Sequence, residues 1–572
     1  METNKETLSP TDRFWRLLKP DQKEIRNVYL YAIFNGLIML SIPLGIQAIV
    51  NLIQGGRVSS SWIVLVVFVV LGVLFSGLLQ IFQLRVVENI QQRIFTRAAF
   101  EFAYRIPRIK MEELYKHYAP ELMNRFFDTM SVQKGLSKVL IDFSAATLQV
   151  IFGLILLSLY HPFFILFSLI LVLLVYVIFR FTAKPGLQAS LKESKHKYTL
   201  AHWLEELART ASTFKLAGAT DLPLSRTNDH VENYLDYREK HFRELLKQFG
   251  FLVGFKVVIA TGLLAIGGVL VMEQLMNIGQ FVAAEIIILM IINSVEKLVT
   301  SLETIYDIFT SLEKIGEVTD LELEPEDKGK HTLEKSDVGM SIHLEQASFH
   351  YPNATRDSLV NVSLVAEPGS RIVVTGTNGS GKTTLLQLLS GIYDLTDGVI
   401  AFDHLPKGNL NLEHLRSSIG DLLSHQQLFE GTLLENIAMG RPAATFENVQ
   451  WAVEAAKLKK MVSEFPDGYN THIDPLGRKL PRSVVQKLLI ARSIADKPRL
   501  LLLEDSFEYI DTNERQVIID FLFDANKPWT LVAVTADPYV IEKASSVYTM
   551  HDGYLASQGG QNQTDPNDKK QK

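Results

Sequence analysis

The chain has 572 residues, 47% of them hydrophobic and 21% charged, with a mean hydropathy of +0.13. This mixture indicates several domains, one part in lipid and another in water. The net charge of −6 argues against the basic face of a nucleic-acid-binding protein, so we expect no nucleic-acid partner. The absence of cysteine excludes disulfides, thiolate metal sites and a cysteine nucleophile.

Residues 1–26 precede the first apolar stretch and lack the apolar core of a signal peptide. Phe14 and Trp15 stand among Arg13, Arg16 and Lys19. This pattern predicts an amphipathic segment that lies on the membrane surface, in contact with lipid. A solvated leader is the alternative.

Six apolar stretches are each long enough to cross a bilayer, which takes ~20 residues. They are 27–50, 61–84, 140–160, 162–181, 249–272 and 278–297. Short turns join them in pairs, whereas two long, charged connections separate the pairs, 85–139 and 182–248. Because the first long connection is rich in arginine and lysine, the positive-inside rule places both long connections and both termini in the cytoplasm. We therefore predict a six-span transmembrane domain over 27–320.

The long connections also carry apolar residues at helical spacing and few helix breakers. The spans are therefore expected to continue beyond the bilayer as helical rods. Pro120 and the stretch 218–223, which contains glycine and proline, mark the expected turns at the far ends of these rods.

Two ionisable residues fall inside predicted spans, Lys256 in the fifth and Glu285 in the sixth. Such residues predict a substrate pathway. The alternative is that Glu285 lies near the outer interface and that Lys256 snorkels inward. Counted from their shared turn, the two residues differ in height by ~12 Å, so we do not expect a direct pair between them.

Residues 321–340 form a charged linker, and 341–555 alternate β-rich and helical patterns as an α/β domain does. The tail, 556–572, has no apolar content to bury and is expected to be disordered. The predicted fold is thus an all-α six-helix membrane domain followed by an α/β domain.

The segment RIVVTGTNGSGKTTLLQLLSGI is the strongest motif in the chain. A β-branched strand leads into G-x-x-x-x-G-K-T and a helix follows, which is the context that a phosphate-binding loop requires. A chance glycine-rich turn is a poor alternative in that context. The predicted nucleotide-binding residues are Gly376, Thr377, Asn378, Gly379, Ser380, Gly381, Lys382, Thr383 and Thr384. In such a loop, backbone N–H groups and Lys382 bind the phosphates of ATP, and the Thr383 hydroxyl binds Mg²⁺.

From these motifs onward the chain resembles ABC transporters. Residues 341–555 are similar to their nucleotide-binding domain, and the six spans with long loops are similar to the membrane half of ABC exporters. Within ASFHYP, the resemblance assigns adenine stacking to Tyr351. The segment MNIGQFVAAEIIILMIINSVEKL resembles the last span of the type I secretion branch, which exports proteins and peptides.

The sequence departs from the family at catalytic motifs. LPRSV replaces the LSGGQ signature, Ser424 falls at the glutamine-loop position with Gln426 and Gln427 nearby, and Ala536 replaces a histidine. In LLLLEDSF the two acids stand in reversed order, which assigns Glu504 to the magnesium side, through water, and Asp505 to a weakened general base. Ser424 is a further candidate for the metal site.

The intact phosphate loop together with these departures predicts ATP binding with slow hydrolysis, with compensating residues that restore ordinary turnover as the alternative. The resemblance implies a subunit of an exporter of proteins or peptides in a bacterial-type inner membrane. A second ABC half-transporter chain, identical or not, is expected as partner, together with a periplasmic adaptor and an outer-membrane channel. The rival function is a catalytically silent ATP-binding subunit that regulates or gates a secretion complex.

Overall fold

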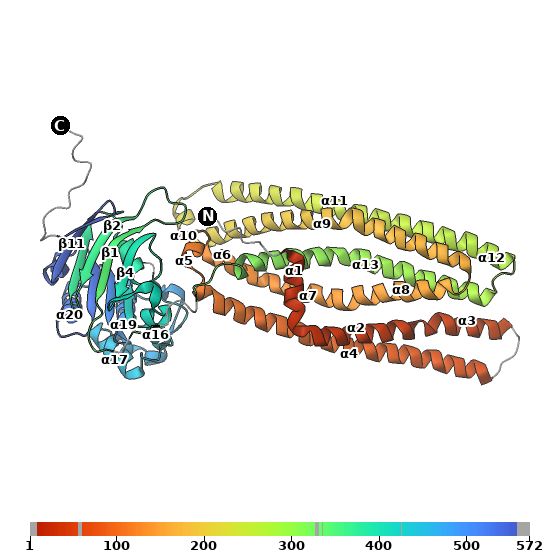
Figure 1. The fold of residues 1–572 in the computed structure, drawn as a ribbon, viewed down its shortest axis with the longest axis horizontal. Coiled ribbons are helices and arrows are strands. Elements are labelled where there is room, and N and C mark those ends of the chain that lie inside the picture. The colour runs from red at the N-terminus through yellow and green to blue at the C-terminus, as the bar shows by residue number, and fades with distance from the viewer. Residues whose placement is uncertain (1–8, 55–59, 326–330, 334–335, 425, 558–572) are drawn as a thin grey trace, which may run out of the picture. The chain divides into compact units, whose positions relative to one another are not determined.

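The computed structural model describes residues 9–54, 60–325, 331–333, 336–424 and 426–557. The chain divides into two compact units (Figure 1). The first comprises residues 1–108 and 117–321, and the second comprises 109–116 and 322–572. Most of the tail for which we expect disorder, 558–572, lies outside the described residues.

The first unit is a bundle of long helices, with the short helix α1 lying across it (Figure 1). Its helices are α1 (Pro10–Leu18), α2 (Gln22–Met39), α3 (Ser41–Gln54), α4 (Ser60–Arg105), α6 (Ala119–Asn124), α7 (Asp128–Lys138), α8 (Ser144–Ser158), α9 (Pro162–Arg209), α10 (Ala211–Leu216), α11 (Leu222–Gly262), α12 (Gly268–Met272) and α13 (Ile278–Thr319). Two π-helical segments, Val139–Phe143 and Leu263–Gly267, join α7 to α8 and α11 to α12. We did not predict these segments.

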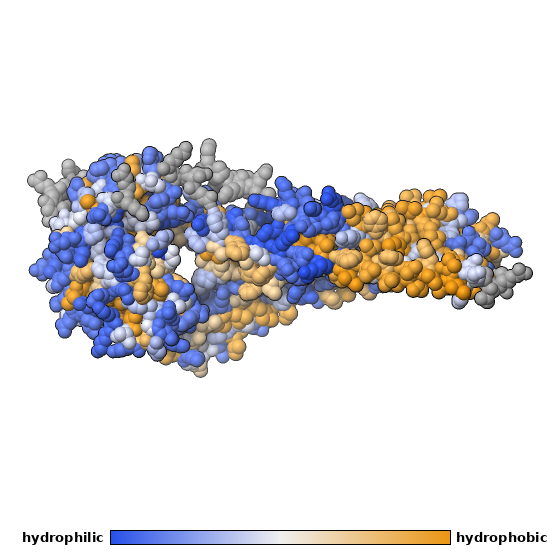
Figure 2. All heavy atoms as spheres, turned by 90° about the horizontal axis from the view of Figure 1, so that it is seen from below, coloured by the Kyte–Doolittle hydropathy of each residue, from blue (hydrophilic) through white to orange (hydrophobic). Residues whose placement is uncertain are grey.

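Six helical runs in this unit are long and apolar enough to cross a membrane, as predicted. Each run has 40 to 51 residues, about twice what a bilayer requires, so each continues well beyond the apolar part. Figure 2 shows that apolar side chains cover one stretch of this unit and that polar side chains cover the stretch next to it. The chain is therefore a multi-pass integral membrane protein.

The rods turn near the residues expected from the sequence. The helix α6 begins at Ala119 with Pro120 in its first turn, where the missing proline N–H costs no hydrogen bond. The helix α11 begins at Leu222, after a turn in which Gly218 has a φ of +74°. Pro185, in contrast, lies inside α9.

The second unit contains a six-stranded sheet with the order β12-β11-β3-β10-β9-β6, in which only β12 (Tyr554–Ser557) runs antiparallel to its neighbour. The other strands are β3 (Arg371–Gly376), β6 (Ile419–Leu422), β9 (Leu500–Glu504), β10 (Thr530–Val534) and β11 (Ser546–His551). The four leucines of β9 are at most 1% exposed, because helices cover both faces of a parallel sheet.

A second, antiparallel sheet has the order β2-β1-β4-β5, and β7 pairs with β8. These strands are β1 (Ile342–Phe349), β2 (Leu359–Ala366), β4 (Asp397–Phe402), β5 (Leu405–Pro406), β7 (Gly431–Thr432) and β8 (His472–Ile473). The helices are α5 (Met111–Leu114), α14 (Lys382–Leu389), α15 (Leu412–Ser417), α16 (Leu433–Ala438), α17 (Phe446–Ala455), α18 (Lys459–Glu464), α19 (Arg482–Ile494), α20 (Thr512–Phe523) and α21 (Pro538–Glu542). The predicted fold class, a helical membrane domain followed by an α/β domain, is confirmed.

Candidate nucleotide site

A glycine-rich loop joins the end of β3 to the start of α14, at the carboxyl edge of the parallel sheet. Gly376 has a φ of +141°, and a Cβ there would lie 2.1 Å from the carbonyl oxygen of Met550. Gly381 has a φ of +102°, and a Cβ there would lie 2.4 Å from the carbonyl oxygen of Ser358. Only glycine fits both positions, so the loop keeps the shape in which its N–H groups can face a phosphate.

Two side chains of the loop are placed for an anion. The Lys382 Nζ donates to the carbonyl oxygens of Gly376 at 2.9 Å and of Thr377 at 2.7 Å, so the lysine folds over the loop. Ser380 is 2% exposed, and its hydroxyl has no hydrogen-bond partner among the described residues. Thr377, Asn378 and Gly379 are exposed, which leaves the loop open to a ligand.

Glu504, at the end of β9, accepts hydrogen bonds from the other residues that we predicted for the metal site. The Thr383 hydroxyl donates to its Oε1, and the Ser424 hydroxyl donates to its Oε2. The Ser424 backbone N–H donates to the same Oε2 at 2.9 Å. Glu504 is 7% exposed, so three hydrogen bonds compensate the burial of its carboxylate.

Asp505 lies outside this cluster. Its backbone has a φ of +41°, unusual for a residue other than glycine, and its N–H donates to the carbonyl oxygen of Val534 at 3.0 Å. Partial desolvation, together with the nearby carboxylates of Glu508 and Glu504, raises the pKa of Asp505. The reversed pair thus divides into a buried, fully bonded glutamate and a solvent-accessible aspartate.

Tyr351, predicted to stack on adenine, has partners of its own. Its hydroxyl donates to Gln387 Oε1 at 2.7 Å and lies 3.0 Å from the Thr384 Oγ1. Its ring stacks on Tyr115, with centroids 5.2 Å apart and planes 20° from parallel. Sequence reasoning missed Tyr115, because it lies 236 positions before Tyr351 with no local motif around it. Tyr115 thus packs on the ring for which we predict adenine stacking.

Replacing Tyr115 by leucine is expected to weaken ATP binding about three- to tenfold, because an aromatic pair contributes roughly 0.5–1.5 kcal/mol. Tyr115→Phe keeps the ring and should bind like the wild type. Equilibrium binding of a fluorescent ATP analogue to the purified chain measures both. Equal affinities for the leucine and phenylalanine variants would show that the stack does not support the base site.

The departures from the family motifs have clear positions. The helix α19 begins at Arg482 with Pro481 as its N-cap, and the Arg482 guanidinium lies 5.3 Å from the centre of the Tyr509 ring. Ala536 follows β10 and is exposed, so no polar side chain stands at the histidine position. Ser424, rather than Gln426, contacts Glu504.

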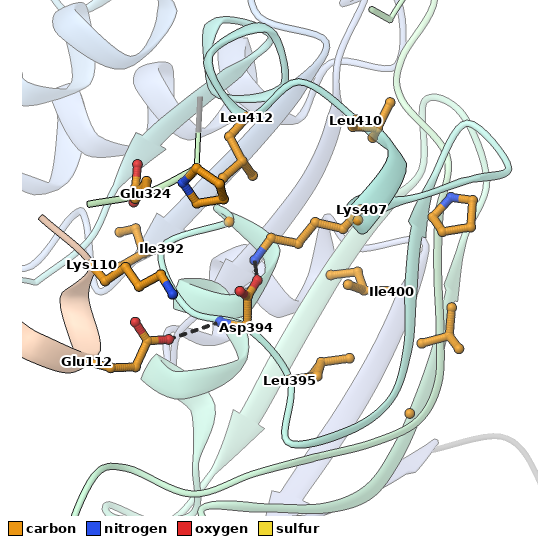
Figure 3. Close-up of a pocket in the computed structure, with 16 residues that line it drawn as sticks. Lys110, Glu112, Glu324, Ile392, Asp394, Leu395, Ile400, Lys407, Leu410 and Leu412 are labelled. Atoms are coloured by element: carbon orange, nitrogen blue, oxygen red, sulfur yellow. Dashed lines mark hydrogen bonds and ion pairs between the residues drawn. The ribbon is translucent and has the colours of Figure 1, made fainter. Parts of the chain in front are cut away.

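A cavity of about 350 Å³ in the same unit is separate from the phosphate loop (Figure 3). Lys407, which is 7% exposed, donates to Asp394 at 2.8 Å inside it, and burial lowers the pKa of Lys407. The Glu112 carboxylate accepts the Asp394 backbone N–H at 3.4 Å. The segment 109–116 thus contacts this cavity through Glu112 and Tyr351 through Tyr115.

In the helical unit the two predicted pathway residues do not meet. Lys256 of α11 instead forms an ion pair with Glu296 of α13 at 2.7 Å, and both side chains are about one third exposed. Glu285 forms no ion pair within the described part of the chain. Glu296 was missed because we compared Lys256 only with Glu285, although Glu296 lies 18 positions beyond Ile278 and so nearly matches the depth of Lys256.

Replacing Lys256 by methionine is expected to lower the thermal unfolding midpoint, because it leaves Glu296 without its partner in an apolar surrounding. Polar contacts between membrane helices contribute about 0.6–2 kcal/mol. The double variant Lys256→Met/Glu296→Gln should recover most of the loss, and Lys297→Met serves as the control. Additive losses in the double variant would show that the pair contributes nothing.

Comparison with known proteins agrees with the two units. Residues 26–295 match the model of the ABC transporter transmembrane region, and residues 359–508 match that of the ABC transporter domain. The ABC transporter domain implies ATP binding. The fold is similar to that of a bacterial Atm1-family ABC exporter solved with ATP bound, with a TM-score of 0.82 over 94% of each chain at 18% identity.

Relatives from bacteria share part or all of this arrangement. The chain is 30% identical to the uncharacterized ABC transporter ATP-binding protein YknU of Bacillus subtilis (strain 168), over 54% of this chain and 52% of the relative. It is 30% identical to a fatty acid ABC transporter ATP-binding/permease protein of Mycobacterium bovis, over 44% of this chain and 39% of the relative. These alignments therefore span about half or less of each relative.

A longer alignment joins the chain to the putative multidrug export ATP-binding/permease protein YgaD of Bacillus subtilis, at 24% identity over 96% of this chain and 95% of the relative. Its two family matches together identify the chain as an ABC transporter transmembrane region fused to an ABC transporter domain, which is the arrangement of an ABC half-transporter.

Proposed function

We propose that the chain is an exporter subunit that uses ATP binding, with slow hydrolysis, to move a substrate across a bacterial-type inner membrane. One observation carries this proposal: the phosphate loop keeps both glycines that its shape requires, whereas the catalytic motifs around it have changed. Such a site would retain affinity for ATP and lose rate, because a single missing donor to the reacting phosphate typically costs about 10²–10³-fold.

Mg²⁺ would be held by Thr383, Ser424 and Glu504, since hydroxyl and carboxylate oxygens are the ligands that this ion prefers. When bound, the ion would neutralise negative charge on the terminal phosphates. Both oxygens of Glu504 already accept hydrogen bonds from Thr383 and Ser424, so the site is oriented before any ion arrives. Asp505 would then be the base that orients and deprotonates the attacking water.

The proposed substrate is a protein or peptide, which rests on the likeness of the last span to the type I secretion branch. The names of two relatives, a fatty acid transporter and a putative multidrug exporter, offer smaller amphiphiles as the alternative. Lys256, Glu296 and Glu285 would line the pathway, since ionisable side chains in spans mark such routes.

The proposed unit of function is a pair of chains, identical or not. In this family each nucleotide lies between the phosphate loop of one chain and the signature of the other, so Pro481 and Arg482 would face the partner's ATP. Both termini would lie in the cytoplasm. A periplasmic adaptor and an outer-membrane channel would complete the route if the cargo is a protein.

The second candidate function is a silent ATP-binding subunit that gates a secretion complex. The exposed Ala536 and the LPRSV segment favour it, because each removes a group that the family places on the terminal phosphate. ATP would then act as a ligand that stabilises one conformation, without being consumed.

ATP binding and ATP hydrolysis by the purified chain in lipid nanodiscs, measured on one sample, separate the two functions. Turnover above that of a Lys382→Ala control supports a pump, and turnover above ~1 per second would show that compensating residues restore ordinary catalysis. Tight binding without turnover supports the silent subunit. No measurable binding would contradict both.

A further inference from the structure

A cavity of about 320 Å³ lies in the helical unit, beneath the short helix α1. Residues of α1, α4, α7 and α13 line it, so segments from the beginning and the end of the membrane region meet there. Neither the nucleotide site nor the pair of Lys256 and Glu296 belongs to this cavity.

The charged residues of the lining are mainly cationic. The lining includes four arginines and two acids, and the neighbouring acids Asp21 and Glu313, outside the lining, pair with Arg97 and Arg13. The arginines are Arg13, Arg16, Arg97 and Arg105, and the acids are Glu101 and Asp320. Within the described residues no acid from outside the lining pairs with Arg16 or Arg105, so positive charge remains there to attract an anion.

The four arginines differ in the ion pairs that they already form. The Arg13 side chain is 10% exposed and pairs with Asp320 at 2.6 Å, and it packs so closely over Gly316 that a Cβ there would lie 1.8 Å from its Nη1. Arg97 pairs with Asp21, which is 2% exposed. These two arginines are therefore already paired and join the segments that form the cavity.

Arg16 and Arg105 remain for a ligand. Arg16 is exposed and has no ion pair among the residues that the structure describes. Among the described residues Arg105 pairs with Glu101 alone, one turn away on its own helix, and such solvent-accessible pairs contribute little. Neither arginine is needed to hold α1 in place.

Apolar side chains complete the cavity. They include Leu17, Ile94, Phe102, Val132, Leu312 and Ile315. A small inorganic anion would gain nothing from this surface. The combination of cations with an apolar wall fits an anion that carries an apolar body.

The position of α1 indicates where such an anion would come from. The large exposed apolar side chains of α2 begin at Tyr29, about 10 Å along the helix from Gln22. Trp15, on α1, is 68% exposed, and an amphipathic helix with exposed tryptophan beside arginine is typical of a membrane surface. Long arginine side chains beside a membrane surface can extend toward lipid headgroups.

We propose that this cavity binds the headgroup of an anionic phospholipid from the leaflet next to α1, with Arg16 and Arg105 contacting its phosphate. Basic pockets between membrane helices are known to take such headgroups. A bound lipid would bridge α1, α4 and α13, and α13 is the helix that leads out of the membrane region. The proposal does not depend on the cargo or on ATP hydrolysis.

Native mass spectrometry of the full chain in detergent tests it, with dioctanoyl phosphatidylglycerol as the probe and no nucleotide. Dioctanoyl phosphatidylcholine and inorganic phosphate are the comparison ligands. Arg16→Gln/Arg105→Gln should weaken binding of the anionic lipid about ten- to thirtyfold, since each cation near a lipid headgroup contributes about 1 kcal/mol. The matched control Lys19→Gln/Arg26→Gln removes the same charge outside the cavity and should change binding less than twofold.

The wild type should also prefer phosphatidylglycerol to phosphatidylcholine by at least tenfold. Equal binding of the two lipids, an equal loss in the control variant, or displacement of the lipid by inorganic phosphate at the same concentration would each overturn the proposal. Thermal unfolding midpoints show whether the variants fold. If the variants do not fold, the comparison of the three ligands on the wild-type chain still tests the proposal.

Discussion

Replacing Lys382 by alanine is expected to weaken ATP binding about 10- to 100-fold and to remove all hydrolysis above background. The lysine amine lies within 2.9 Å of two loop carbonyl oxygens, so it stands over the place where phosphates would bind. A hydrogen bond to a charged group contributes about 1.5–3 kcal/mol, and alanine offers none. Binding and turnover of the purified chain in nanodiscs measure both effects.

Lys460→Ala is the matched control, because that side chain is 91% exposed on α18, away from the loop. It should bind and hydrolyse ATP as the wild type does. If Lys382→Ala kept wild-type affinity, the loop would not be the phosphate site, and both proposed functions would fail. If affinity fell while the wild type showed no turnover, the silent subunit would remain.

The sequence predicts the fold correctly where a hydrophobic pattern or a motif extends over many consecutive residues. Six apolar stretches and one strand–loop–helix motif are local signals, and the helices and β3 lie where those signals placed them. Glu504, Thr383 and Ser424 also meet, although 80 or more positions separate Glu504 from the other two. The phosphate-loop motif assigned Thr383 and the family resemblance assigned Glu504 and Ser424, since periodicity alone does not bring distant residues together.

What escaped prediction depends on packing between distant segments. The stack of Tyr115 on Tyr351 and the ion pair of Lys256 with Glu296 each join residues with no shared motif. The contact of Arg13 with Gly316 joins the first helix to the last helix of the membrane region. A glycine at position 316 has no local reason in the sequence, and only the guanidinium packed over it explains why a side chain would not fit.

Lengthening the proposed base, Asp505→Glu, is expected to raise ATP turnover about tenfold or more without changing ATP affinity. A general base must approach within ~2.6–3.2 Å of the proton that it takes, and correct placement contributes about 10²–10⁴-fold in rate. The aspartate is one methylene shorter than the glutamate of the family, and its accessible carboxylate has room to extend. Turnover in nanodiscs measures the effect, with Asp467→Glu, an exposed aspartate elsewhere in the domain, as control.

The reciprocal change, Glu504→Asp, is expected to lower turnover and Mg²⁺-dependent ATP binding. The two oxygens of Glu504 reach Thr383 and Ser424 at once, and a shorter side chain would lose at least one of them while remaining buried. The usual order of acids, restored in Glu504→Asp/Asp505→Glu, should therefore be slower than Asp505→Glu alone. If instead the double variant were the fastest, Ser424 would be no substitute for the missing glutamine. If Asp505→Glu changed nothing, the altered signature and Ala536 would limit the rate, and the silent subunit would become the stronger proposal.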